Sequence, residues 1–221
     1  MKILLLLLLT LAGLMAAPDK WEKDIVKFEG AAKANPHPKG ALLFVGSSSI
    51  RMWNLKTSFP EKKTINHGFG GSELSDSVHF ADRIVIPHAP KIVFLYAGDN
   101  DINKGKSAAI VIADYQTFVA RIHAALPKTG IAFLPIKPSL SRWEKWPEMQ
   151  KANHAIEAIS KKNPRLDYLD TATPMLGGDG KPMGHLFQDD GLHLNEAGYR
   201  VWNKVVTQWL ATKVSEPPSR E

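Results

Sequence analysis

The sequence predicts an α/β fold in which helices cover both faces of a parallel β-sheet. Short apolar runs alternate along the 221 residues with segments whose apolar side chains recur at helical spacing. Strands and helices that alternate in this way form a parallel sheet, because each helix carries the chain back to the same end of the sheet. A chain of this length suits one domain with a full core.

The first half of the chain contains three of the predicted strands. Trp21, Ile25 and Phe28 fall on one face of an amphipathic helix that precedes them. Gly46 directly follows the first apolar run and lets the chain turn sharply there. The predicted elements are a helix over 21–34, a strand over 41–45, a short helix over 50–53, a strand at 64–65, a helix from about residue 73 and a strand over 92–96.

The second half continues the alternation to the last helix. Ser107 has the side chain of an N-cap, and Asn195 can cap the last helix in the same way. The predicted elements are a helix over 107–126, a strand over 131–136, a helix over 148–161, a strand over 166–169 and a last helix that carries Val201, Trp202, Val205 and Trp209. We expect one domain over 17–214, followed by a frayed tail over 215–221 that contains two prolines.

The first 16 residues have the pattern of a secretory signal peptide. Lys2 supplies a charged start, residues 3–11 form an apolar core, and Ala16 is a small residue suited to cleavage. The core is shorter than the ~20 residues of a membrane-spanning helix. Cleavage one residue later is disfavoured, because it would leave a proline beside the cut. We therefore expect residues 1–16 to be removed and the protein to be exported, periplasmic or secreted, without a stable membrane anchor.

Composition excludes several classes of partner and cofactor. The chain has 28 Lys and Arg against 22 Asp and Glu, a net charge of +6, but its basic residues are scattered, so we expect no nucleic-acid partner. It has no cysteine, which excludes a lipoprotein anchor. The phosphate-binding loop, the dinucleotide fingerprint and the His-Glu-x-x-His motif are absent, and residues 177–180 lack the ligands of a calcium loop. We expect no metal and no cofactor.

Two polar segments carry the residue types that ester hydrolysis needs as nucleophile and base. Ser48 follows the apolar run over 41–45, so it is exposed at the carboxyl end of a strand. Asp190 and His193 are separated by a glycine and a leucine, and the chain can fold back there. This spacing lets the carboxylate reach Nδ1 of the imidazole and leaves Nε2 free for the serine.

Two further segments can supply hydrogen-bond donors for an oxyanion. Residues 66–71 and 98–101 each follow a predicted strand, and ligands of open parallel sheets bind beyond such strand ends. Gly71 has no side chain, so its backbone N–H can approach a ligand closely. The side-chain amide of Asn100 can reach the same crevice.

Each of these segments, taken alone, also has a structural explanation. Residues 46–49 can be a polar turn with a helix cap, and residues 66–71 a flexible loop in which His67 is structural. Residues 99–101 can be an N-capping cluster, and Asp190 can open an ordinary turn into a helix. Four such coincidences in the order that one active site requires are improbable, so their joint occurrence favours catalysis.

In order and spacing, residues 46–49, 66–71, 98–101 and 190–193 resemble the four signature blocks of the SGNH hydrolases, the GDSL-type esterase and lipase superfamily. The resemblance covers residues 39–209. It implies a three-layer α/β/α, flavodoxin-like fold with a five-stranded parallel sheet.

The resemblance also implies the role of each site residue. It makes Ser48 the nucleophile and Asp190 and His193 the rest of the triad, with Ser48, Gly71 and Asn100 as the oxyanion hole. The neighbouring Asp189 fits less well than Asp190 with the Asp-x-x-His spacing of the family. One departure is Ser47, which stands where the family usually has an aspartate.

The substrate class is less determined than the chemistry, because the family includes lipases, lysophospholipases, thioesterases and carbohydrate deacetylases. Arg142 and Trp143 follow the fourth strand, where Trp143 can stack on a sugar ring and Arg142 can meet an anionic group. Packing of Trp143 against the sheet edge is the alternative. No long apolar insertion resembles a lid, and a small open site suits short acyl groups.

The sequence therefore favours an exported serine esterase for short-chain acyl esters, with an O-acetylated saccharide as the leading substrate. A lysophospholipase-like or thioesterase-like acyl hydrolase is the alternative within the same chemistry. A non-catalytic carbohydrate-binding protein on the same fold is the alternative from a different class.

Overall fold

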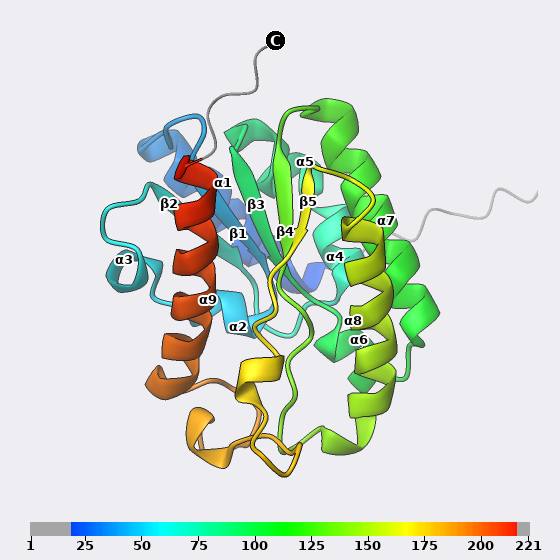
Figure 1. Cartoon of the computed structure of the whole chain (residues 1–221). Coiled ribbons are helices and arrows are strands. Elements are labelled where there is room, and N and C mark those ends of the chain that lie inside the picture. The colour runs from blue at the N-terminus through cyan, green and yellow to red at the C-terminus, as the bar shows by residue number, and fades with distance from the viewer. Residues whose placement is uncertain (1–18, 216–221) are drawn as a thin grey trace, which may run out of the picture.

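The computed structural model describes residues 19–215 (Figure 1). The predicted signal peptide over 1–16 lies outside the described residues, as does the predicted tail apart from Ser215. Between residues 19 and 215, no helix has both the length and the apolar character that crossing a membrane requires.

The five strands form one parallel sheet in the order β2-β1-β3-β4-β5. This order confirms the predicted flavodoxin-like arrangement, whose direction of winding reverses between β1 and β3. Ligands of such folds bind beyond the carboxyl ends of the strands at that reversal. The strands are β1 (Leu42–Gly46), β2 (Thr64–Gly68), β3 (Ile92–Tyr96), β4 (Gly130–Phe133) and β5 (Leu166–Tyr168).

Helices cover both faces of the sheet, as predicted (Figure 1). One face carries α1 (Glu22–Ala34), α4 (Leu74–His79), α5 (Ala81–Ile84), α7 (Ala108–Ala125) and α8 (Trp146–Ser160). The other carries α2 (Ser48–Arg51), α3 (Leu55–Ser58) and α9 (Glu196–Ser215). The remaining helices are α6 (Asp99–Asn103) and the 3₁₀ helices η1 (Asp19–Trp21), η2 (Ile86–His88), η3 (Trp143–Lys145), η4 (Thr173–Met175) and η5 (Gly184–Leu186).

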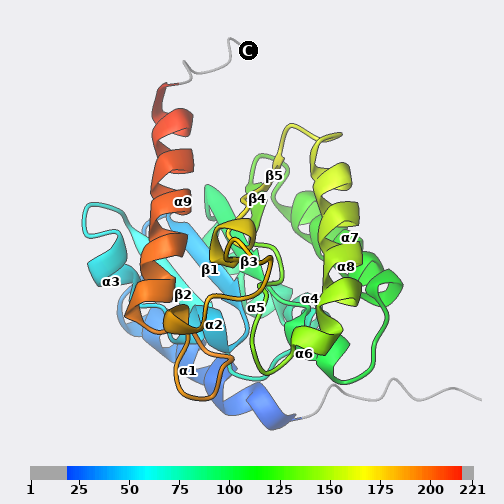
Figure 2. The same ribbon diagram turned by 60° about the horizontal axis from the view of Figure 1, so that its bottom comes forward.

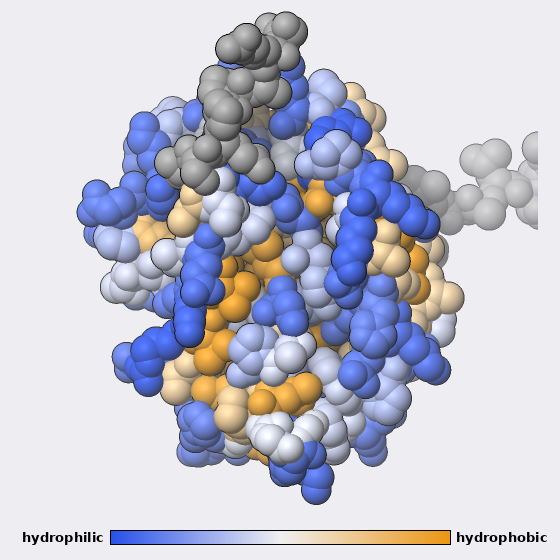
Figure 3. All heavy atoms as spheres, viewed as in Figure 1, coloured by the Kyte–Doolittle hydropathy of each residue, from blue (hydrophilic) through white to orange (hydrophobic). Residues whose placement is uncertain are grey.

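Two separate apolar clusters form the core, one on each face. Successive side chains of a strand point to opposite faces, so Leu43 and Val45 of β1 join the cluster under α7 and α8. Phe44 joins the cluster under α9, where it stacks on Phe94 of β3 at 4.4 Å between ring centroids. In the view of Figure 1, apolar residues also reach the surface between the mostly hydrophilic residues of α8 and α9 (Figure 3).

The structure corrects several predicted element boundaries. The short helix predicted over 50–53 begins at Ser48, because the Ser47 carbonyl accepts the N–H groups of both Ile50 and Arg51. The single helix predicted from residue 73 is divided into α4 and α5. The strand predicted over 131–136 pairs only as far as Phe133, since Pro135 has no N–H to continue the ladder.

Candidate active site

The nucleophile candidate lies at the turn between β1 and α2. Gly46 ends β1 with φ +138°, and a Cβ atom added there would lie 1.8 Å from the Tyr96 carbonyl oxygen of β3. The N–H of Ser47 donates to this same oxygen at 3.1 Å. Only glycine fits so close to the neighbouring strand. The turn therefore presents Ser48, the first residue of α2, at the carboxyl end of the sheet.

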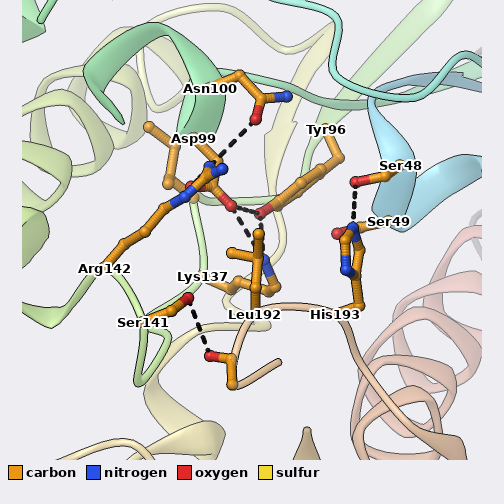
Figure 4. A network of polar contacts seen from close by, with 12 residues as sticks. Ser48, Ser49, Tyr96, Asp99, Asn100, Lys137, Ser141, Arg142, Leu192 and His193 are labelled. Carbon is orange, nitrogen blue, oxygen red and sulfur yellow. Dashed lines mark hydrogen bonds and ion pairs between the residues drawn. The ribbon is translucent and has the colours of Figure 1, made fainter. Parts of the chain in front are cut away.

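The structure brings Ser48, His193 and Asp190 together, although Ser48 lies 145 residues before His193. His193 Nε2 is 3.0 Å from Ser48 Oγ, and His193 Nδ1 is 2.5 Å from Asp190 Oδ2. Figure 2 shows the loop that leads into α9 beside α2, and Figure 4 shows the contact between Ser48 and His193. The three side chains are thus joined by two hydrogen bonds in the order that nucleophilic catalysis needs.

The protonation states follow from the surroundings of Asp190. Its Oδ1 accepts the backbone N–H groups of Leu192 and His193, each at 2.9 Å. The hydrogen bond from His193, followed by that from the Leu192 backbone, lowers the pKa of Asp190 to about 2. An ionised carboxylate can only accept, so Nδ1 of His193 carries the proton of this contact. The other ring nitrogen is then free to accept from Ser48.

The side chains of His193 and Asp190 reach solvent. The side chain of His193 is 26% exposed and that of Asp190 46%. Asp189, the neighbouring alternative in the sequence, is also exposed, but among the described residues it makes no hydrogen bond with His193.

Gly71 lies in the turn after β2, next to open space. It has φ +76°, and a Cβ atom added there would meet no atom within 4 Å. Within residues 19–215, no hydrogen bond engages its backbone N–H. Asn66, from the same sequence segment, has a structural role instead. Its Nδ2 donates to the carbonyls of Ile50 at 2.7 Å and Trp53 at 3.1 Å, which ties α2 to β2.

Asn100 lies in the first turn of α6, after β3. Its Nδ2 donates to the carbonyl oxygen of Ser72 at 2.9 Å, so the third and second sequence segments are joined. Its Oδ1 accepts from Arg142 Nη1 at 3.1 Å. Asn100 is therefore bonded to the residue that directly follows Gly71, so the two candidate oxyanion donors lie close together.

The side chains of Arg142 and Trp143, which the sequence predicted to be free to bind substrate, both make contacts within the protein. Arg142 is 15% exposed and forms a 2.6 Å ion pair with Asp99 in addition to its contact with Asn100. Trp143 is half-buried, packs against the core and stacks on Trp146 at 5.9 Å between ring centroids. The geometry thus agrees with the packing alternative for Trp143, and a role in substrate binding stays a prediction for both residues.

A buried polar cluster beneath Asn100 was not predicted. Lys137 Nζ lies 3.0 Å from Asp99 Oδ2 and 3.2 Å from the hydroxyl of Tyr96, and Lys137 is 1% exposed (Figure 4). Burial opposes ionisation of Asp99, but the charges of Lys137 and Arg142 outweigh it and hold its pKa below the ordinary value. A lysine directly after the apolar run over 131–136 was the sequence signal for a buried charge pair.

No three His, Asp or Glu side chains in the described part of the chain group together in a way that could hold a metal ion.

Comparison with known proteins identifies related sequences and folds. The model of the GDSL-like Lipase/Acylhydrolase family matches residues 49–201, which include Gly71, Asn100, Asp190 and His193. No curated protein matches the chain.

Solved structures share the fold over most of the chain. A Streptococcus pneumonia protein provisionally described as a platelet activating factor is 21% identical, with a TM-score of 0.78 over 87% of this chain and 93% of that chain. A GDSL-like lipase from Bacteroides thetaiotaomicron is 19% identical, with a TM-score of 0.74 over 86% and 99%. A catalytic mutant of an acetylxylan esterase from Geobacillus stearothermophilus is 15% identical, with a TM-score of 0.64 over 83% and 98%. At these identities the likeness establishes a shared fold.

Proposed function

The chain belongs to the GDSL-like lipase/acylhydrolase family, and we propose that it is an exported serine esterase that hydrolyses short-chain acyl esters. The observation that carries the proposal is the hydrogen-bonded series from Ser48 through His193 to an ionised Asp190. A non-catalytic protein would not need these three side chains to be hydrogen-bonded to one another in this order.

Each group has a defined step in the reaction. His193 Nε2 takes the hydroxyl proton as Ser48 Oγ attacks the acyl carbon, and Asp190 stabilises the imidazolium that forms. The backbone N–H groups of Ser48 and Gly71 and the Nδ2 of Asn100 donate to the oxyanion. His193 then gives its proton to the leaving alcohol, and a water molecule activated in the same way releases the acyl group from Ser48.

Two observations support a short acyl group. His193 and Asp190 are exposed to 26% and 46%, as at an open site without a covering lid. Several solved structures with the same fold are named as acetyl esterases, among them the acetylxylan esterase and an acetyl esterase with bound acetate ion. We therefore favour acetyl on a saccharide as the substrate.

Export is the second part of the proposal and depends on residues 1–16 acting as a cleaved signal peptide. Expression in a Gram-negative host, followed by N-terminal sequencing of the periplasmic protein, tests it. The proposal requires a mature chain that begins at Ala17. A full-length chain retained with the cells would contradict it.

Hydrolysis of a chain-length series tests the proposed activity. We expect kcat/KM to be highest for p-nitrophenyl acetate and to fall through butyrate and octanoate, with acetate released from acetylated xylan. A maximum at long acyl chains, or release of fatty acid from lysophospholipid in preference to acetate, would favour the lipase-like alternative. Binding of saccharides without any turnover would instead indicate a non-catalytic protein.

A further inference from the structure

We propose that Arg142 is a positioning residue that holds the Asn100 amide as an oxyanion donor, rather than an anchor for an anionic substrate. The inference rests on the proposed function, because it assigns a role within the same reaction. It starts from the contact of Arg142 Nη1 with Asn100 Oδ1 at 3.1 Å.

The orientation of the Asn100 amide is fixed by what lies on each side of it. Nδ2 faces the carbonyl oxygen of Ser72, which can only accept, and Oδ1 faces the guanidinium of Arg142, which can only donate. Turning the amide over would place two acceptors together and two donors together. The second hydrogen of Nδ2 has no acceptor among the described residues, and Figure 4 shows this nitrogen on the side of Ser48.

Arg142 is itself held in place by the buried cluster. One hydrogen of Nη1 donates to Asp99 Oδ1 at 2.6 Å and the other is available for Asn100. Asp99 is fixed in turn by Lys137 at 3.0 Å and by the Tyr96 hydroxyl at 3.2 Å. Asp99 precedes Asn100 in the first turn of α6. The long side chain of Arg142 is thereby bonded to the first turn of α6, and this turn also carries the Asn100 amide that Arg142 orients.

The charges of the cluster also favour a negative charge beside Asn100. Asp99 contributes −1, and Lys137 and Arg142 contribute +1 each, which leaves a net charge of +1. A hydrogen bond from a cation to the amide oxygen polarises the amide, so its N–H becomes a stronger donor. This gain is largest when the substrate carbonyl has become an oxyanion, and it therefore raises kcat more than it lowers KM.

A direct interaction with an anionic substrate is the competing role for Arg142. Its other guanidinium donors have no hydrogen-bond partner among residues 19–215, and its side chain is 15% exposed. In that role the loss of Arg142 would raise KM for anionic esters and leave the turnover of neutral esters unchanged.

A double-mutant cycle separates the two roles. It uses Arg142→Met, Asn100→Ala and the double variant, with p-nitrophenyl acetate as the neutral ester and mono-p-nitrophenyl succinate as the anionic one. We expect Asn100→Ala to lower kcat by ~10²–10³. Arg142→Met should lower kcat by about 10-fold for both esters with little change in KM, within the coupling range of residues in contact. In the Asn100→Ala background, the Arg142 substitution should have little further effect.

Controls separate positioning from a general loss of structure. Arg121 of α7 pairs with Asp82 on the surface, and Arg121→Met should leave both kinetic constants unchanged. Arg142→Lys keeps a cation beside Asp99 and should recover part of the lost kcat. If circular dichroism shows that Arg142→Met does not fold, the Arg142→Lys variant replaces it in the double-mutant cycle.

The outcomes are distinguishable from a failure of the proposed function. A wild-type protein without Ser48-dependent turnover would overturn the esterase and this inference together. An active wild type in which Arg142 substitution leaves kcat unchanged, raises KM only for the succinate ester, or adds fully to the loss from Asn100→Ala would overturn this inference alone.

Discussion

His193 and Asp190 form a local unit in which one carboxylate is bound at both of its oxygens. Asp190 Oδ2 receives His193 Nδ1 at 2.5 Å, and Oδ1 receives two backbone N–H groups of the same turn. Gly191, at φ +63°, allows this tight turn. The proposed base and the carboxylate bound to it thus come from four consecutive residues, whereas Ser48 is positioned by the turn that follows β1.

The acid limb of the pH–rate profile should report one proton. Because the pKa of Asp190 is lowered to about 2, the carboxylate is ionised at every pH above about 4. Protonation of Asp190 then adds no second step to the profile, so the slope of log kcat/KM against pH should not exceed one above this pH. A profile measured with p-nitrophenyl acetate checks this. A slope of two above about pH 4 would contradict the assignment.

The nucleophile can be identified by covalent labelling. A fluorophosphonate should add once per chain, on Ser48, because among residues 19–215 only this hydroxyl is hydrogen-bonded to His193. Ser48→Ala should abolish both labelling and turnover. Ser47 and Ser49 are neighbouring controls that are each 2% exposed, and Ser47→Ala and Ser49→Ala should still label. Mass spectrometry that located the adduct on either neighbour would refute the assignment of Ser48.

Local sequence features predicted most of the elements that position the proposed catalytic groups. The apolar runs located the three central strands β1, β3 and β4, since a strand buried on both faces must be apolar along its length. The edge strand β2 was predicted only at residues 64–65, because Asn66, His67 and Gly68 continue it without apolar side chains. The spacing of Asp190 and His193 was informative because their contact is formed within a single turn. Helices of four to six residues, such as α2, α4 and α5, are too short to show a helical period, so their boundaries were wrong or missed.

The partners of Arg142 could not be predicted in the same way. Its contact with Asp99 joins residues 43 apart in the chain, from two different loops, and no local pattern specifies which side chains of neighbouring loops meet. The position of Arg142 after the fourth strand predicted a side chain that is free to meet an anionic group of a substrate. Its guanidinium instead pairs with Asp99 and donates to Asn100.

Gly46 should be essential for the geometry of the site. An alanine Cβ would lie 1.8 Å from the Tyr96 carbonyl oxygen, so β1 and β3 would have to separate. We expect Gly46→Ala to lower the free energy of unfolding by more than about 4 kcal/mol, as severe core clashes do. Gly40 is the matched control, because it has φ +77° but no atom within 4 Å of an added Cβ. Gly40→Ala should lower the free energy of unfolding, measured by urea denaturation, by only about 1–2 kcal/mol. Equal losses would contradict the prediction.

His67 should make the protein less stable in acid. It is 2% exposed in β2, its Nδ1 lies 2.8 Å from the Ile84 carbonyl oxygen, and its ring stacks on Phe28 at 4.5 Å. The carbonyl can only accept, so a neutral His67 donates through Nδ1. Burial, together with the nearby rings of His88 and His37, lowers the pKa of His67 from 6.5 to about 4.

The sign of the effect follows from proton binding. Between pH 6.5 and 4 the unfolded chain binds more protons at His67 than the folded chain, so the free energy of unfolding falls as the pH falls. The contribution is fully present above pH 6.5 and is lost by pH 4, and it amounts to about 3 kcal/mol.

His67→Asn removes the titrating ring and keeps a donor for the Ile84 carbonyl. We expect this variant to be less stable at pH 7 but to lose less stability between pH 7 and 4, whereas the exposed His154→Asn should behave as wild type. Urea denaturation at each pH measures the difference. An unchanged pH dependence in His67→Asn would show that other groups control acid stability.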